Sequence, residues 1–91
     1  MSIGLVYMVS GQLDRALGYC LKSQSIFDTL GLQHTSNYAI GLLNIAILYE
    51  KKGQSNMAGK YYRGSYDTFV RAGYSGKNRD IALNNAKRLG Y

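Results

Sequence analysis

The chain has 91 residues, of which 46% are hydrophobic and 18% charged, and its formal net charge is +6. This length allows one small domain at most, and this apolar content is enough for a core, which excludes a multidomain protein and a disordered tail. One cysteine rules out an internal disulfide framework, and the absence of proline, which interrupts helices, favours an all-helical chain.

Gly11 separates the first two predicted helices. Residues 1–10 are mostly apolar but lack the basic start and the cleavage pattern of a signal peptide, so we expect them to belong to the fold. The second helix is predicted from about Leu13 to Leu30, because its apolar residues recur at three- and four-residue steps. Gly31 then marks the end of this helix.

The third predicted helix runs from about residue 37 to residue 52. Thr35 or Ser36 supplies a hydroxyl that can cap its first free backbone N–H. Residues 39–49 are apolar almost all round, which indicates an inner helix that is buried on several sides. Gly53 marks the turn that follows.

The fourth helix is predicted from about Ser55 to Ala72, ended by Gly73, and the last from Asn78 to Leu89. The last helix is apolar on one side only, as the closing helix of a stack requires. Short and long connections alternate along the chain. Since short connections join antiparallel neighbours, each unit is predicted to be a helical hairpin.

Residues 7–31 return as residues 49–73, which is an internal repeat. A repeat of this length indicates a solenoid built from one supersecondary unit. Solenoids expose long surfaces and rarely form deep catalytic pockets, so the pattern favours binding to another chain. The matching pairs, each 42 positions apart, are Tyr7/Tyr49, Gly11/Gly53, Gln12/Gln54, Ala16/Ala58, Tyr19/Tyr61, Ser23/Ser65, Phe27/Phe69 and Gly31/Gly73.

The spacing of tyrosine, glycine and alanine in both copies resembles that of the tetratricopeptide repeat (TPR). The motif reads Tyr7-x3-Gly11-x4-Ala16 and Tyr49-x3-Gly53-x4-Ala58. The usual period is about 34 residues. The longer period here resembles the units of kinesin light chains and of sensor domains in bacterial signalling proteins. HEAT-type repeats, with periods of about 40–47 residues, remain an alternative but do not explain this spacing.

This resemblance implies an all-α, TPR-like α-α superhelix with about two helical hairpins and a C-terminal capping helix. We expect a single domain over 1–91, with repeat 1 at 1–31 (its start shortened), repeat 2 at 32–73 and a closing helix at 74–91. An apolar first helix with nothing before it indicates either a piece of a longer array or self-association into a homo-oligomer, and self-association is the hypothesis that we favour. The expected contact residues are Ile3, Leu5, Val6 and Val9.

The resemblance also implies a groove lined by the first helices of successive repeats. Asn44 stands where an asparagine in similar domains hydrogen-bonds an extended peptide, and an amide offers both a donor and an acceptor. The alternative is that Asn44 bonds its own helix or the next repeat. Glu50 is also placed in this groove. The expected partner-binding residues are Ile40, Leu43, Asn44, Ile47, Lys51 and Asn84.

One histidine and five scattered acidic residues do not form a catalytic set, and His34 has no second ligand at metal spacing. We therefore expect no enzyme, no metal and no cofactor. No stretch approaches the roughly 20 apolar residues that span a bilayer, and we expect a cytoplasmic protein without a membrane partner. Cys20 is expected in the core.

The main functional prediction is a protein–protein interaction module that binds a peptide or helix of a partner, one that is acidic given the positive net charge. Seven of the eleven basic residues follow position 59, which leaves nucleic-acid binding as a second, less favoured hypothesis. The third is a structural or oligomerisation segment of a larger signalling protein.

Overall fold

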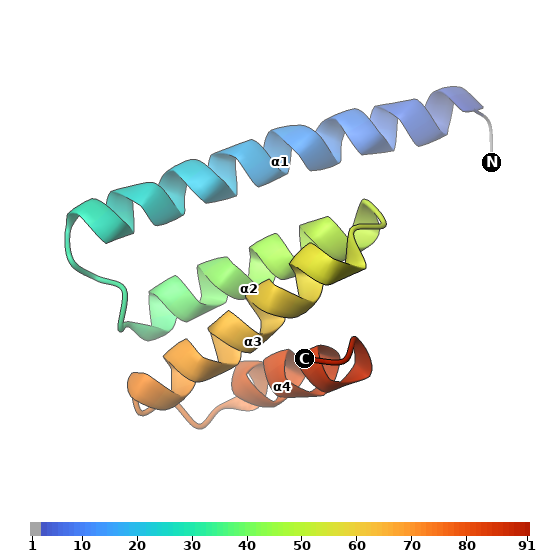
Figure 1. Ribbon diagram of the computed structural model, residues 1–91. Coiled ribbons are helices and arrows are strands. Elements are labelled where there is room, and N and C mark those ends of the chain that lie inside the picture. The colour runs from blue at the N-terminus through green and yellow to red at the C-terminus, as the bar shows by residue number, and fades with distance from the viewer. Residues whose placement is uncertain (1–2) are drawn as a thin grey trace.

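Four consecutive helices make up the fold. The computed structural model describes the backbone of residues 3–91 and the side chains of residues 11–91. The helices are α1 (Ile3–Thr29), α2 (Ser36–Lys51), α3 (Ser55–Arg71) and α4 (Lys77–Arg88), and residues 3–91 contain no strand. Each helix reverses the direction of the one before it and packs beside it (Figure 1). The prediction of an all-α fold is confirmed.

The predicted turn at Gly11 is wrong. α1 passes through this residue as one continuous helix, so the first of the two expected hairpins is absent. A methyl group built on Gly11 would meet nothing within 4 Å, so no close neighbour requires glycine at this position. Glycine weakens a helix interior by roughly 1 kcal/mol without breaking it, and α1 tolerates that cost.

The other helix boundaries agree with the predictions to within about one residue, the usual uncertainty of a helix end. Thr35 is the N-cap of α2, and its hydroxyl oxygen accepts a hydrogen bond from the backbone N–H of Tyr38 at 3.2 Å. Gly53 has a φ of 81° in the short turn between α2 and α3. Such a positive φ is readily adopted only by glycine, which explains the residue type at this turn.

The two long connections begin with the same backbone turn. Gly31 and Gly73 both have a φ of 72°. In each connection the glycine N–H bonds a carbonyl three residues back at 3.1 Å, and the next N–H bonds one five residues back at 2.9 Å. This is the Schellman pattern of a helix C-terminus, and it also occurs at Gly53 and Gly90. After this turn the connections differ, because six residues separate α1 from α2 and five separate α3 from α4.

The hydrophobic core lies where α2, α3 and α4 meet. It contains several alanines, whose small side chains allow helices to approach closely. All four, Ala46, Ala58, Ala82 and Ala86, are fully buried. The core residues are Leu43, Ala46, Ala58, Tyr62, Ala82 and Ala86. The complete burial of Ala58 fits a close crossing of helices at this position.

α1 packs against α2 through a polar contact as well as an apolar one. The amide of Gln24 is 6% exposed and donates from Nε2 to the backbone oxygen of Tyr38 at 3.1 Å. A side chain at Gly41 would overlap this amide, so glycine is what allows α1 to lie so close. Asp14 and Lys52 form an ion pair at the other end of the contact.

Candidate partner-binding surface

One face of α2 carries most of the residues that the sequence nominates for binding. Ile40, Asn44, Ile47 and Lys51 are separated by three or four positions and therefore share one face of the helix. Asn44 and Lys51 are exposed, and the two isoleucines are half-buried. We call this set the α2 stripe. The stripe presents apolar surface together with an amide and a cation. These two polar groups lie on a helix that is otherwise largely apolar.

Leu43 is not part of this surface. Its side chain is only 5% exposed and belongs to the core between α2, α3 and α4. The resemblance to tetratricopeptide repeats implied that Leu43 lies in the groove, but the sequence does not show which apolar position of α2 faces α4. The prediction that Leu43 contacts a partner is therefore wrong, since a partner cannot reach it.

Asn44 and Asn84 are both exposed. Neither side chain forms a hydrogen bond with any residue from Gly11 to Tyr91, whereas the neighbouring Asn85 donates to the oxygen of Ile81 at 3.0 Å. The alternative that Asn44 bonds its own helix therefore finds no support in that part of the chain. Both amides keep their full capacity to bind another molecule.

An ion pair joins the C-terminal ends of α2 and α4. Arg88 donates from Nη2 to Glu50 Oε2 at 2.5 Å, and Asn84 lies one turn before Arg88 on α4. Tyr62 of α3 donates from its hydroxyl to the other oxygen of Glu50 at 2.8 Å. Glu50, which the sequence placed in the groove, instead connects three helices.

These contacts change the acidity of the groups that make them. The hydrogen bond from Tyr62, followed by that from Arg88, lowers the pKa of Glu50 below its ordinary value. Burial and the hydrogen bond to Glu50 raise the pKa of Tyr62. Glu50 is therefore ionised at neutral pH and is already satisfied within the chain, which argues for a structural role rather than contact with a partner.

All five acidic residues have partners within the chain, whereas most basic residues do not. The acidic residues pair as Asp14 with Lys52, Asp28 with the hydroxyl of Tyr38, Glu50 with Arg88, Asp67 with Arg63, and Asp80 with Arg79. Seven of the eleven basic residues form no ion pair with residues 11–91: Arg15, Lys22, Lys51, Lys60, Arg71, Lys77 and Lys87. They are distributed over all four helices, so the excess positive charge does not form a single track.

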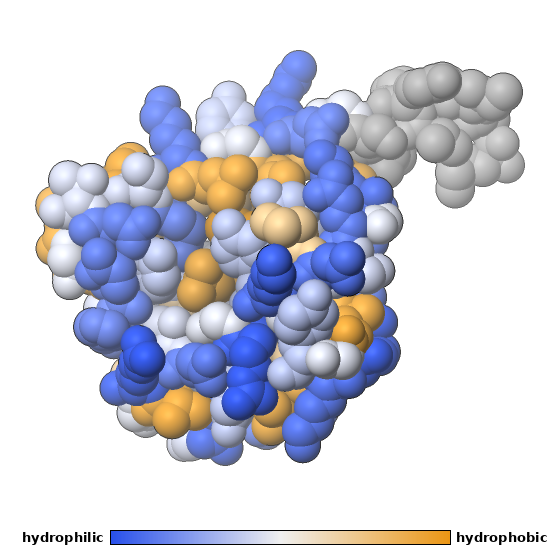
Figure 2. Space-filling model, viewed as in Figure 1, coloured by the Kyte–Doolittle hydropathy of each residue, from blue (hydrophilic) through white to orange (hydrophobic). Residues whose placement is uncertain are grey.

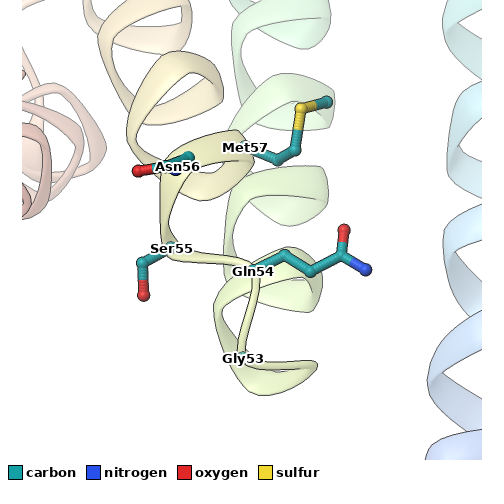
Figure 3. Close-up of a pocket in the computed structure, with 5 residues that line it drawn as sticks. All are labelled: Gly53, Gln54, Ser55, Asn56 and Met57. Atoms are coloured by element: carbon teal, nitrogen blue, oxygen red, sulfur yellow. The ribbon is translucent and has the colours of Figure 1, made fainter.

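Two surface hollows lie outside the α2 stripe, and no motif of the sequence points to either. One, of about 380 Å³, lies between α2 and α3 and is lined by Leu42, Met57, Lys60, Tyr61 and Gly64. The other, of about 450 Å³, follows the turn from Gly53 to Met57. In Figure 3, the side chains of Gln54 and Met57 are directed to the side of the view on which α1 lies, whereas those of Ser55 and Asn56 are directed to the opposite side. The polar side chains of this hollow therefore do not converge on one point.

The outer surface is mixed in character. In Figure 2 the face shown is largely hydrophilic, with hydrophobic residues in several separate areas. No group of three or more His, Cys, Asp or Glu residues within the described chain is placed to hold a metal ion. Cys20 is a half-buried free thiol. Among the described helices, none combines the length and the apolar character needed to traverse a bilayer.

The predicted oligomer contacts Ile3, Leu5, Val6 and Val9 lie outside the residues whose side chains the structure describes. Comparisons of the chain with models of protein families, with curated proteins and with solved structures find no match.

Proposed function

We propose that this chain is a non-enzymatic, TPR-like interaction module that binds a peptide or a helix of a partner protein along the α2 stripe and the adjoining exposed side of α4. The observation that carries the proposal is the state of Asn44. It is an exposed amide that forms no hydrogen bond with residues 11–91, set between two half-buried isoleucines. Apolar contacts with a backbone-binding amide between them are a recurring mode of peptide recognition.

The partner surface that fits this site is acidic. Lys51 is exposed on the stripe, Lys87 is exposed at the corresponding end of α4, and neither forms an ion pair with residues 11–91. Because every acidic residue of the chain is already paired internally, excess positive charge remains for a partner. Complementary charge increases the rate and the specificity of association. The free thiol of Cys20 suits a reducing compartment, so we include a cytoplasmic location in the proposal.

A peptide array tests this proposal directly. Labelled protein is applied to short peptides that differ in their content of acidic and apolar residues, and to single-stranded and double-stranded nucleic acid. We expect binding to peptides that carry both acidic and apolar residues, and loss of that binding in Lys51→Glu. The matched control is Lys22→Glu, which makes the same charge change at an exposed position on α1.

Salt separates the protein-binding reading from the nucleic-acid one. Affinity that depends on phosphate contacts falls steeply with ionic strength, because each neutralised phosphate releases counterions. A peptide held by apolar contacts, an amide and one or two lysines loses less affinity, because few charges are neutralised and it has no condensed counterions to release. Nucleic-acid binding that falls steeply with salt, without retention of any peptide, would contradict the proposed function.

A further inference from the structure

One face of α1 is more exposed than its counterpart in the second repeat. Ala16 and Tyr19 of α1 match Ala58 and Tyr61 of α3, 42 positions later. Ala58 is fully buried and Tyr61 is half-buried. By contrast, Ala16 is only half-buried, and Tyr19 is 69% exposed. We call the positions of Ala16 and Tyr19 the open face of α1.

In the second repeat, α2 covers this face. The ring of Tyr49 stacks on that of Tyr61, with centroids 5.5 Å apart and planes inclined by 23°. Aromatic pairs of this kind contribute beyond the area that they bury. Tyr49 lies near the end of α2, and the chain then reverses at Gly53, where φ is 81°. The reversal is what brings Tyr49 back onto Tyr61.

The sequence contains a second copy of the covering segment. Residues 3–7 read Ile-Gly-Leu-Val-Tyr and residues 45–49 read Ile-Ala-Ile-Leu-Tyr. Both segments are followed, four residues after the tyrosine, by Gly-Gln. Tyr7 precedes Tyr19 by 12 positions, as Tyr49 precedes Tyr61. The chain therefore carries the sequence that would cover the open face of α1.

The straight course of α1 prevents this segment from covering its own helix. Positions 7 and 19 lie in one continuous helix, where 12 residues correspond to about 18 Å along the axis. Two rings at that separation cannot stack. At its N-terminal end α1 also runs past the neighbouring end of α2 (Figure 1). The backbone of this segment therefore does not lie over positions 16 and 19 of its own helix.

We propose that residues 3–10 of one copy cover the open face of α1 in a second copy, with Tyr7 stacked on the partner copy's α1 in the way Tyr49 stacks on Tyr61. The exchange is reciprocal, so each copy completes the first repeat of the other. Exchange of an identical element between two copies reuses contacts that the sequence already specifies, which makes it a low-cost route to a dimer. This inference does not depend on the proposed peptide site on α2.

Fluorescence tests the exchange, because the chain has no tryptophan and Tyr19→Trp introduces a single reporter on the open face. Emission, quenching by acrylamide and mass by sedimentation are measured over a range of protein concentrations. We expect the emission to move to shorter wavelength and the quenching to fall as the mass rises from monomer to dimer. Tyr7→Ala in the same background should weaken the dimer by about tenfold or more.

Two glycine variants identify which copy supplies the covering segment. Gly11→Ala favours the straight helix and opposes a left-handed turn at this position, so exchange between copies should be kept or strengthened. Gly18→Ala is the control, because Gly18 lies in the same helix and an added methyl would also meet nothing within 4 Å. It changes helix propensity without affecting a turn at Gly11.

Three results would overturn the inference. The first is a shielded reporter in a monomer at every concentration, weakened by Gly11→Ala, which would show that the segment folds back on its own helix. The second is an exposed reporter in a monomer at every concentration, which would leave the open face uncovered. The third is a dimer with an exposed reporter, which would place the interface elsewhere.

Discussion

Ser65 donates a hydrogen bond from its hydroxyl to the backbone oxygen of Ala39 at 2.7 Å, and both residues are fully buried. On the preceding residue of α2, the oxygen of Tyr38 accepts the hydrogen bond from Gln24 of α1. Two adjacent carbonyls of α2 are thus held by side chains from the two helices on either side. Because polar bonds are directional, they fix the axial position of α2 more narrowly than apolar contact does.

The hydrogen bond from Ser65 should make a measurable contribution to the free energy of unfolding. Ser65→Ala removes the donor, and we expect the free energy of unfolding to fall by about 1 kcal/mol, the usual net value of such a bond. Urea denaturation followed by circular dichroism measures the change. Ser23→Ala is the control, because Ser23 holds the same place in the first repeat but is exposed. Equal losses in the two variants would contradict the role given to Ser65.

Adding a single methyl group at Gly41 should lower the free energy of unfolding. In Gly41→Ala the new side chain displaces the amide of Gln24, which then loses its bond to Tyr38. Alanine improves helix propensity by about 1 kcal/mol, but a buried amide without a partner costs more, so we expect a net loss of about 1–2 kcal/mol. Thermal unfolding distinguishes this from Gly18→Ala, which adds the same methyl in open space and should stabilise the chain.

Ala58 lies at a helix crossing where no space remains. Ala58→Leu overpacks the core, and we expect a loss of about 1–3 kcal/mol in the free energy of unfolding. Met57→Leu is the neighbouring control, since Met57 is 36% exposed and a similar-sized apolar residue there should change stability by less than about 0.5 kcal/mol. An unchanged melting curve for Ala58→Leu would show that the crossing is looser than its burial indicates.

Replacing Asn44 should weaken the binding of a peptide partner without changing the stability of the fold. Asn44→Ala removes an exposed amide that bonds nothing from Gly11 to Tyr91, so melting should be unchanged. We expect affinity for a peptide selected from the array to fall by about 1–2 kcal/mol, measured by calorimetry, the scale of a lost hydrogen-bond pair. Asn56→Ala, at an exposed position beside the turn at Gly53, is the control. Unchanged affinity in Asn44→Ala would remove the α2 stripe from consideration.

Alkaline pH should weaken the contact between Tyr38 and Asp28. Burial, followed by the hydrogen bond to Asp28, raises the pKa of Tyr38 from 10.0 to about 12. Because the folded state favours the neutral phenol, this stabilisation is complete below pH 10 and is lost as the pH rises toward 12. Tyr38→Phe should therefore be less stable than the natural chain at neutral pH, with a difference that shrinks over this window in pH-dependent urea unfolding. A constant difference across pH 10–12 would contradict this linkage.

Turns and helices could largely be predicted from the sequence because local chemistry determines them. Gly31, Gly53 and Gly73 occupy positions with positive φ, which glycine adopts without strain. Thr35 caps α2 because its hydroxyl reaches the N–H of Tyr38. Gly11 has the same flanking motif as Gly53 but lies inside a helix. The residue type permits a turn there without requiring one, so the motif alone could not decide between the two conformations.

The contacts between distant residues could not be predicted from the sequence. Leu43 and Ile47 are both apolar residues of α2, and only the position of α4 places the former in the core and leaves the latter half-buried. Likewise, Glu50 and Arg88 are 38 residues apart, and nothing in the local pattern joins them. The periodicity of one helix is enough to place Asn44 on the α2 stripe. The surroundings of Leu43 and Glu50 depend on how α2, α3 and α4 pack together.

Because the helix-ending turns at Gly31 and Gly73 have the same φ and the same pattern of two hydrogen bonds, the fold has a modular property. A duplicated segment copying residues 32–73 would follow Gly73 with the connection that already follows Gly31, so the new junction would reuse an existing one. Chains lengthened in this way would form a series in which molecular length grows by a constant increment per added unit.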